Sequence, residues 1–277
     1  MDAASRCSSG ASRSRVDRRV LYDSPRVYEL LFADRRDDVA FYRTLARGVD
    51  HVLEFGVGAG RVALPVARDG ASVTGVDASE AMLHALRERL AGELEGVRAR
   101  VTTHHGDMRT WRGERRFALV TCPFNGVAHL HTAEDFAAFF ANVRAHLAPG
   151  GRFVFDAWLP DPALLRETSL ESARFVHPDS GEAVTLREEF SYDAYAQVLS
   201  VRLTVTPVLR PEAREVLTLT QRQLFPEETL ALLRAHGFEV AWRTSAFRPP
   251  PAEGARGDHL EPPDRRGALL AYVCTAR

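Results

Sequence analysis

A glycine-rich segment headed by an acidic residue is the part of this sequence best suited to hold a ligand. Residues 54–60 read EFGVGAG, directly after an apolar stretch and directly before a segment with helical periodicity. Glycines let a backbone turn tightly and approach a ligand without an intervening Cβ, and the helix that follows offers free N–H groups to a negative group. The carboxylate of an amino-acid ligand suits such a site. A dinucleotide-binding GxGxxG pattern would need a third glycine where this chain has Arg61.

Two more carboxylates follow apolar stretches further along the chain. Asp77 ends the second stretch, where an acidic side chain can accept hydrogen bonds from both hydroxyls of a ribose. Asp107 and Met108 follow the third, and suit the amino group and the ring face of an adenine. Since ligands of open α/β sheets bind beyond the carboxyl ends of the strands, we expect these groups to converge on one crevice.

The elements that position these residues have the pattern of βαβ units. Short apolar runs alternate with helix-period segments between Val52 and Trp158, which predicts an α/β fold with a parallel sheet. Ser79 is the predicted N-cap of the second helix, and a later helix covers residues 133–147 before the breakers at 148–151. The strands expected are residues 51–55, 72–77, 98–104, 117–122 and 151–157.

The periodicity changes after Trp158. Residues 183–192, 198–207 and 216–224 alternate apolar with polar side chains, as half-exposed antiparallel strands do. A helix is predicted from Pro226 to His236, and two final strands over residues 238–247 and 268–274.

Taken together, the motifs resemble those of class I S-adenosylmethionine-dependent methyltransferases. The ExGxGxG form of residues 54–60 is similar to motif I of that family, and three later segments agree: 73–79 (VTGVDAS), 106–108 (GDM) and 147–151 (LAPGG). The resemblance covers roughly residues 20–158. It implies S-adenosylmethionine as cofactor and a Rossmann-like, mostly parallel seven-stranded sheet with helices on both faces, interrupted by an antiparallel β insertion after strand 5.

The resemblance also implies roles for individual residues. Asp77 would hold the ribose, Glu54 would orient the loop or hold a water by the amino group, and Arg61 would reach the carboxylate. Met82 would pack near the adenine; the alternative is that it belongs to the helix core, because apolar residues at helical spacing are usually core. The remaining cofactor contacts expected are Gly56, Gly58 and Gly60 along the methionine portion, Ala78, Asp107 and Met108 around the adenine, and Phe124.

Methyl transfer is an in-line displacement at a carbon on a sulfonium, so most of the help an enzyme gives is positioning. Aromatic faces can hold a sulfonium, and in the resembling enzymes an N-terminal segment closes over the cofactor. Tyr28 is our first candidate and Tyr22 our second, with ordinary packing as the alternative. His129 is the candidate base, ahead of His131, although many such histidines only cap a helix or satisfy a loop carbonyl.

The histidine loop and the β insertion are similar, more loosely, to amino-sugar and glycine-type N-methyltransferases. The predicted function is therefore methyl transfer to a small molecule, most readily at an amine nitrogen, with Trp158 and residues 187–192 as places for acceptor contact. The alternatives are transfer to oxygen or carbon, a non-catalytic cofactor-binding protein of the same fold, and a nucleotide-dependent oxidoreductase. The domain division expected is a disordered tail (1–18), a cofactor-binding core with an N-terminal helical lid (19–158), an acceptor-side β insertion (159–225) and a final helix and strands that complete the core (226–277).

Composition narrows the partners. The 36 basic and 37 acidic residues leave a formal charge of -1, so we expect a small-molecule acceptor and neither nucleic acid nor membrane; a homodimer is left open. The sequence contains no lysine, which excludes Schiff-base, pyridoxal phosphate and P-loop chemistry. Its three cysteines are far apart, so we expect reduced thiols and a cytoplasmic protein. The adjacent His104 and His105 point to opposite faces of a strand, so we expect no metal site.

Overall fold

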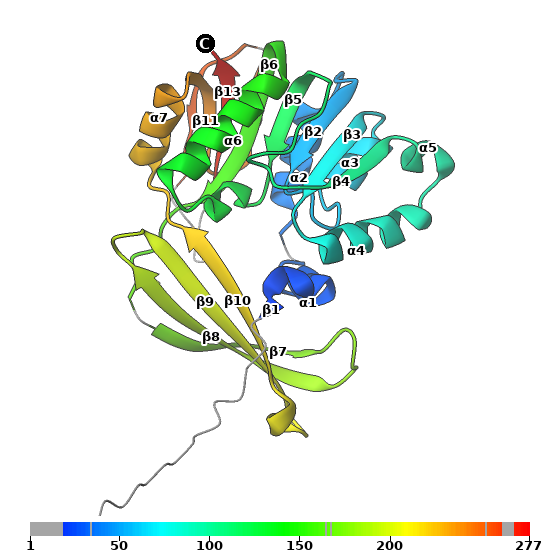
Figure 1. Cartoon of the computed structure of the whole chain (residues 1–277), viewed down its shortest axis with the longest axis vertical. Coiled ribbons are helices and arrows are strands. Elements are labelled where there is room, and N and C mark those ends of the chain that lie inside the picture. Colours follow the sequence, from blue (N-terminus) through cyan, green and yellow to red (C-terminus); the bar gives the residue numbers. More distant parts are fainter. Residues whose placement is uncertain (1–18, 34, 164, 167, 253, 262–268) are drawn as a thin grey trace, which may run out of the picture.

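The chain folds around two sheets (Figure 1). The computed structural model describes residues 19–33, 35–163, 165–166, 168–252, 254–261 and 269–277, so the expected disordered tail lies outside the described residues. The larger sheet has the strand order β12-β11-β13-β6-β5-β2-β3-β4. Its strands are β2 (His51–Phe55), β3 (Ser72–Asp77), β4 (Val101–His105), β5 (Phe117–Cys122), β6 (Leu147–Trp158), β11 (Phe238–Thr244), β12 (Gly257–His259) and β13 (Leu269–Ala276).

The larger sheet is mostly parallel, as predicted. Strands β6, β5, β2, β3 and β4 run parallel to one another, while β13 lies antiparallel between β6 and β11. Seven of these strands were expected; the short β12 is the eighth and pairs only with β11. The parallel register places Phe55, Asp77 and His105 at the carboxyl ends of neighbouring strands, which is where the ligand-binding groups were expected.

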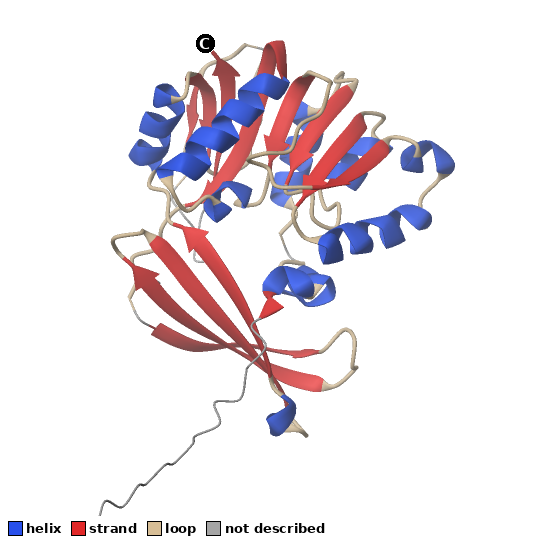
Figure 2. Cartoon of the chain, viewed as in Figure 1, coloured by secondary structure: helices blue, strands red, loops and turns tan. Residues whose placement is uncertain are grey.

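Helices cover both faces of this sheet (Figure 2). Successive residues of a strand point to opposite faces, so Val52 packs in the layer of α2, α3 and α4, and Leu53 in the layer of α6 and α7. Each layer buries its own apolar cluster. Among the helices of the described residues, none has the length and apolar character needed to span a bilayer. The helices are α1 (Pro25–Leu31), α2 (Asp37–Leu45), α3 (Ala63–Arg68), α4 (Glu80–Ala91), α5 (Glu95–Arg98), α6 (Ala133–His146) and α7 (Pro226–Ala235), with short 3-10 turns η1 (Leu21–Asp23), η2 (Gly126–His129) and η3 (Pro211–Ala213).

The smaller sheet is antiparallel apart from one short edge pairing, and η1 and α1 pack on it. Leu21 and Val27 are fully buried in a cluster with Leu186, Leu203 and Leu217 of the sheet. Figure 1 shows α1 lying between this sheet and the rest of the molecule. The N-terminal segment is therefore held over the carboxyl edge of the larger sheet by the insertion. The strands of the smaller sheet are β1 (Arg19–Val20), β7 (Thr168–Val176), β8 (Ala183–Asp193), β9 (Val198–Pro207) and β10 (Glu215–Arg222).

Several boundaries differ from those predicted. Strand β4 begins at Val101 instead of residue 98, because Glu95–Arg98 forms the short helix α5. Strand β6 begins at Leu147, which pairs with Phe117, so the breakers at 148–151 lie within an irregular strand. Strand β7 was not predicted; it is an edge strand whose described side chains are mostly exposed, so it lacks an apolar alternation.

Candidate active site

A large cavity opens at the carboxyl edge of the parallel strands, beneath η1 and α1. Its volume is about 1200 Å³. Pockets for small ligands are usually about 300–1,000 Å³, so this one has room for more than one small molecule. Leaving aside His131, the second choice of base, the predicted cofactor and catalytic residues line it with one exception. Those that do are Tyr22, Tyr28, Glu54, Gly56, Gly58, Arg61, Asp77, Ala78, Met82, Asp107, Met108, Phe124 and His129.

The exception is Gly60. It is buried and does not line the cavity; a Cβ at this position would lie 2.4 Å from Cδ1 of Leu86 and 3.1 Å from Cγ of Leu64. Gly60 is thus a packing residue of the turn, and its expected contact with the ligand has no support in the cavity lining. Close packing of the turn against α4 and α3, together with a φ of +82°, requires glycine there.

The other two glycines of the segment do face the cavity. Gly56 has a φ of +69°, and a Cβ there would meet no atom within 4 Å. Gly58 has a φ of +55°, and its Cβ would lie 3.3 Å from Cε of Met82. Met82 is thus both a buried residue of α4 and part of the cavity wall, so the two roles considered for it coexist.

Asp77 holds the glycine loop in place. One carboxylate oxygen accepts a hydrogen bond from the Gly58 amide at 2.7 Å, and the other accepts from the Ser79 amide at 2.8 Å. Ser79 in turn caps α4 by accepting from the Met82 amide, as predicted. Burial raises the pKa of Asp77, against the lowering effect of these backbone hydrogen bonds. The side chain therefore has a structural task besides any contact with a ligand.

A second acid, Glu54, lies at the base of the cavity. It is 2 % exposed, and burial raises its pKa to about 8. A carboxyl group in this setting is largely protonated at neutral pH. It would ionise readily if a cationic group came close.

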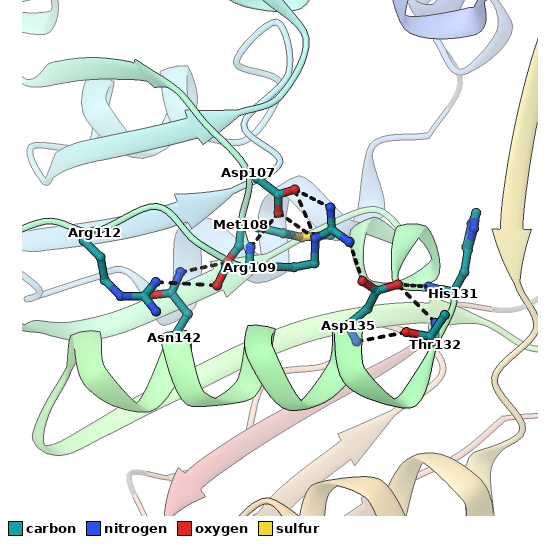
Figure 3. Close-up of polar contacts among 8 residues, drawn as sticks. All are labelled: Asp107, Met108, Arg109, Arg112, His131, Thr132, Asp135 and Asn142. Atoms are coloured by element: carbon teal, nitrogen blue, oxygen red, sulfur yellow. Dashed lines mark hydrogen bonds and ion pairs between the residues drawn. The ribbon is translucent and has the colours of Figure 1, made fainter.

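The far end of the cavity is built around Arg109 (Figure 3). Its guanidinium binds both carboxylate oxygens of Asp107 and also pairs with Asp135. Asp135 accepts hydrogen bonds from the amides of His131 and Thr132, at the start of α6. The ionic contact with Arg109 lowers the pKa of Asp107, which stays ionised. This network joins the end of β4 to the loop that carries the histidines, and the sequence analysis did not anticipate it.

Arg61 is already engaged by the protein. It forms a two-pronged ion pair with the buried Asp38, donates to the backbone carbonyl of Arg35, and lies 4.4 Å over the ring of Phe124. Since Asp38 is on α2, this contact ties the N-terminal helices to the glycine loop. The expected contact of Arg61 with a ligand carboxylate stays a prediction.

Aromatic side chains from the N-terminal segment form one wall of the cavity. The rings of Tyr22 and Tyr28 lie 5.4 Å apart, and Phe32 and Phe124 lie 5.1 Å apart at a steep angle. The hydroxyl of Tyr22 is 2.7 Å from Nε2 of His129. Sequence analysis did not foresee this pairing, because the two residues belong to distant segments.

The environment of His129 alters its expected chemistry. Burial lowers its pKa to about 4, and the nearby His131 acts in the same direction. Burial also raises the pKa of Tyr22, so the phenol stays protonated and shares a hydrogen bond with the neutral ring, in which the tautomer of His129 decides the donor. A histidine with so low a pKa is a poor acceptor of a proton from an ammonium. The structure thus favours a hydrogen-bonding role through Tyr22 over the general base predicted.

Other residues considered from the sequence lie elsewhere. His131, Trp158 and residues 187–192 are not among the residues lining the cavity, to which the insertion contributes Pro178. Trp158 instead has the guanidinium of Arg35 4.1 Å over its ring. The expectation of acceptor contacts by Trp158 and 187–192 has no support in the shape of this cavity.

Comparisons with known proteins agree with this architecture. Residues 52–151 match the family described as "Methyltransferase domain". A dTDP-3-amino-3,4,6-trideoxy-alpha-D-glucopyranose N,N-dimethyltransferase of Streptomyces venezuelae is 30% identical over 144 residues, which cover 49% of this chain and 57% of that protein. The chain thus spans a little over half the length of this curated relative.

Solved structures resemble the whole chain. The CcbJ methyltransferase of Streptomyces caelestis is 25% identical, with a TM-score of 0.70 over 93% of this chain and 98% of that one. CalS10, an amino pentose methyltransferase of Micromonospora echinaspora solved with S-adenosylmethionine bound, is 25% identical, with a TM-score of 0.62 over 89% and 96%. Residues 52–151 therefore match the methyltransferase domain family, and the chain has the fold of these S-adenosylmethionine-dependent methyltransferases.

Proposed function

We propose that this protein transfers a methyl group from S-adenosylmethionine to the nitrogen of a small-molecule amine. The observation that carries the proposal is one cavity in which the glycine loop, the strand-end acids and the aromatic N-terminal segment all meet. Its volume of about 1200 Å³ leaves space for an acceptor beside the cofactor.

The residues present fit the cofactor. Gly56 and Gly58 open their backbone to the cavity, where the amino-acid part would lie. Asp77 is fixed by two amides, and each of its oxygens has a second lone pair for a ribose hydroxyl. Glu54 would lose its proton beside an ammonium group, which supplies the charge that a zwitterionic tail needs. Ala78, Met82, Asp107 and Met108 line the part assigned to the adenine.

When bound, the cofactor supplies a methyl carbon made electrophilic by the positive sulfur. The aromatic wall of Tyr22, Tyr28 and Phe124 would hold that positive charge against electron-rich ring faces and would keep water away. No residue needs to bond covalently to the methyl group. What the chain contributes is alignment of the nucleophile with the carbon–sulfur bond.

For the acceptor, the Tyr22–His129 pair offers the best-placed polar group. Held by His129, the Tyr22 oxygen keeps a lone pair that can accept a hydrogen bond from an N–H. This contact directs the nitrogen lone pair toward the methyl group without removing a proton. The amine must then arrive neutral, since the pKa of His129, about 4, is too low for it to serve as a base.

Nitrogen is favoured over oxygen or carbon for two reasons. An alcohol needs a base to become a good nucleophile, and His129 is a weak one, whereas a neutral amine needs none. The relatives whose names specify an acceptor are N-methyltransferases of amino sugars and of glycopeptides. We also place the enzyme in the cytoplasm, which fits the free, buried thiols of Cys122 and Cys274. Size measurements in solution would show whether it forms a homodimer.

A radiolabelled methyl-transfer assay against matched panels of amines, alcohols and carbon acids tests the proposal. We expect label to appear in an amine, and S-adenosylhomocysteine to bind in calorimetric titrations while NADH does not. Binding of S-adenosylhomocysteine with no acceptor methylated across the three panels would instead support a non-catalytic cofactor-binding protein. Tight binding of NADH alone would reject methyl transfer altogether.

A further inference from the structure

Asp156 is a buried carboxylate that the proposed transfer does not use. It lies near the end of β6, is fully buried and does not line the cavity. Its carboxylate accepts three hydrogen bonds: from the Tyr42 hydroxyl at 2.7 Å, the Phe124 amide at 2.8 Å and the Asn125 amide at 2.8 Å. A buried acid is costly unless it is bonded in this way, so its presence calls for a local reason.

The two amides belong to a strained turn. Phe124 has a φ of 54° and Asn125 a φ of 60°, and both lie in the left-handed region, which costs about 1–2 kcal/mol for a residue with a side chain. Such a conformation persists only where the surroundings enforce it. Successive amides aimed at one acceptor form an anion-binding concavity, and here Asp156 fills it. The Asn125 side chain closes the turn by accepting from the Trp158 amide at 3.1 Å.

The turn at Phe124 and Asn125 sets the position of the aromatic side chains that line the cavity. Phe124 makes edge contacts with Tyr28 and Phe32, with ring centroids 6.3 Å and 5.1 Å away, and lies under the guanidinium of Arg61. The 3-10 turn Gly126–His129 follows directly, so the same turn also sets the position of His129. A right-handed backbone at these two positions would carry both side chains out of their present contacts.

We infer that Asp156 is a positioning residue for methyl transfer: it holds the left-handed turn at Phe124 and Asn125, and through that turn places Phe124 and His129 at the reacting end of the cavity. This inference rests on the proposed function for its catalytic consequence. Its structural part, that Asp156 sets the turn, can be measured without any activity.

Several titratable groups around Asp156 influence whether its carboxyl group is protonated. Tyr42, Asp38 and Arg61 interact with it electrostatically, as does the thiol of Cys122. Burial raises the pKa of Asp156 to about 6, although its hydrogen bonds act in the opposite direction. Three donors face the group, and hydrogen bonds of this kind favour its ionised form.

The test compares Asp156→Asn with Tyr42→Phe as a matched control. Asparagine keeps the size but turns an NH₂ group toward one of the donors, whereas Tyr42→Phe removes a bond to the same carboxylate and leaves both turn amides bonded. We expect Asp156→Asn to lower kcat by about 10- to 100-fold, the loss of one buried hydrogen bond to a charged group, and to weaken S-adenosylhomocysteine binding by less than about threefold. Tyr42→Phe should change kcat less than about threefold.

Hydrogen exchange followed by mass spectrometry supplies the readout without activity. Amides in the peptide spanning residues 123–131 should exchange faster in Asp156→Asn and at the normal rate in Tyr42→Phe. If the two variants have the same kcat and exchange, Asp156 is only a core residue and the inference is overturned. Inactive wild-type enzyme would refute the proposed function, while the exchange result would still decide the role of the turn.

Asn125→Ala provides a second route should Asp156→Asn not fold. It leaves the carboxylate in place, removes the contact with the Trp158 amide and makes the left-handed conformation less favourable. The same pattern of lower kcat and faster exchange is expected. Unchanged values for both would contradict a positioning role for the turn.

Discussion

Replacing Gly56 and Gly60 in turn by alanine should distinguish a glycine that leaves space for the ligand from one that close packing requires, although both belong to one motif. Their φ angles are +69° and +82°, so each alanine incurs a similar left-handed strain, about 1–2 kcal/mol. The space around them differs. The Cβ at position 60 would lie 2.4 Å from Leu86, whereas the Cβ at position 56 would meet no atom within 4 Å and Gly56 lines the cavity.

The magnitudes follow from that difference. Forcing a methyl group into a packed region costs about 1–3 kcal/mol beyond the strain. We therefore expect Gly60→Ala to lower the free energy of unfolding by about 2–5 kcal/mol and Gly56→Ala by about 1–2 kcal/mol. At about 2–4 °C per kcal/mol for a chain near this size, the Tm falls by about 4–20 °C and 2–8 °C respectively.

Ligand affinity should show the reverse order. A methyl group at Gly56 holds the cofactor tail away from the backbone and removes about one charge-assisted hydrogen bond, which weakens S-adenosylhomocysteine binding by about 10- to 150-fold. Thermal unfolding and calorimetric titration, carried out well below either Tm, measure the two effects. The reasoning is refuted if Gly60→Ala is as stable as Gly56→Ala, or if Gly56→Ala binds the ligand like the wild type.

Four further substitutions test the site. Asp77→Asn places an NH₂ group against the Gly58 or Ser79 amide and should weaken S-adenosylhomocysteine binding by about 10- to 150-fold in calorimetry; unchanged binding would exclude the ribose role. The pKa of Glu54 is about 8 in the folded protein against an ordinary 4.5, so its contribution to stability is complete below pH 4.5 and is lost as the pH rises through 8. Glu54→Gln does not titrate there. Its free energy of unfolding relative to wild type, measured in denaturant titrations, should therefore rise between pH 5 and pH 8 by an amount on the order of 4 kcal/mol. A constant difference would show that Glu54 does not titrate there. Tyr22→Phe and His129→Ala should each lower turnover by about tenfold or more with little change in cofactor affinity; an equal fall in both quantities would mean a structural role.

Most of the cofactor half of the site could be predicted because its signals are local. A glycine that needs a positive φ, an acid at a strand end and a helix cap are each written in a few consecutive residues, as Gly56, Asp77 and Ser79 are. Parallel strands then bring their carboxyl ends together without further information. Gly60 shows the limit of this reasoning, because the spacing of the motif does not say whether a glycine faces a ligand or a leucine.

The acceptor half could not be predicted in the same way. Strand β7 has no apolar alternation because it lies at an edge, and the acceptor contacts expected of Trp158 fall outside the cavity. One signal was available but unused: Asp156 stands in an otherwise apolar run, residues 153–158 of β6, and a charged residue there implies specific partners.

What the sequence alone determined, then, is the order of the elements, the mostly parallel sheet and the ligand-facing loops, since each depends on periodicity and on residues next to one another in the chain. Only the tertiary structure decided that Tyr22 bonds to His129, that Arg61 is held by Asp38 and that Asp156 supports the turn at Phe124. Those contacts join segments far apart in sequence, and burial at each of them shifts pKa values that no local pattern encodes.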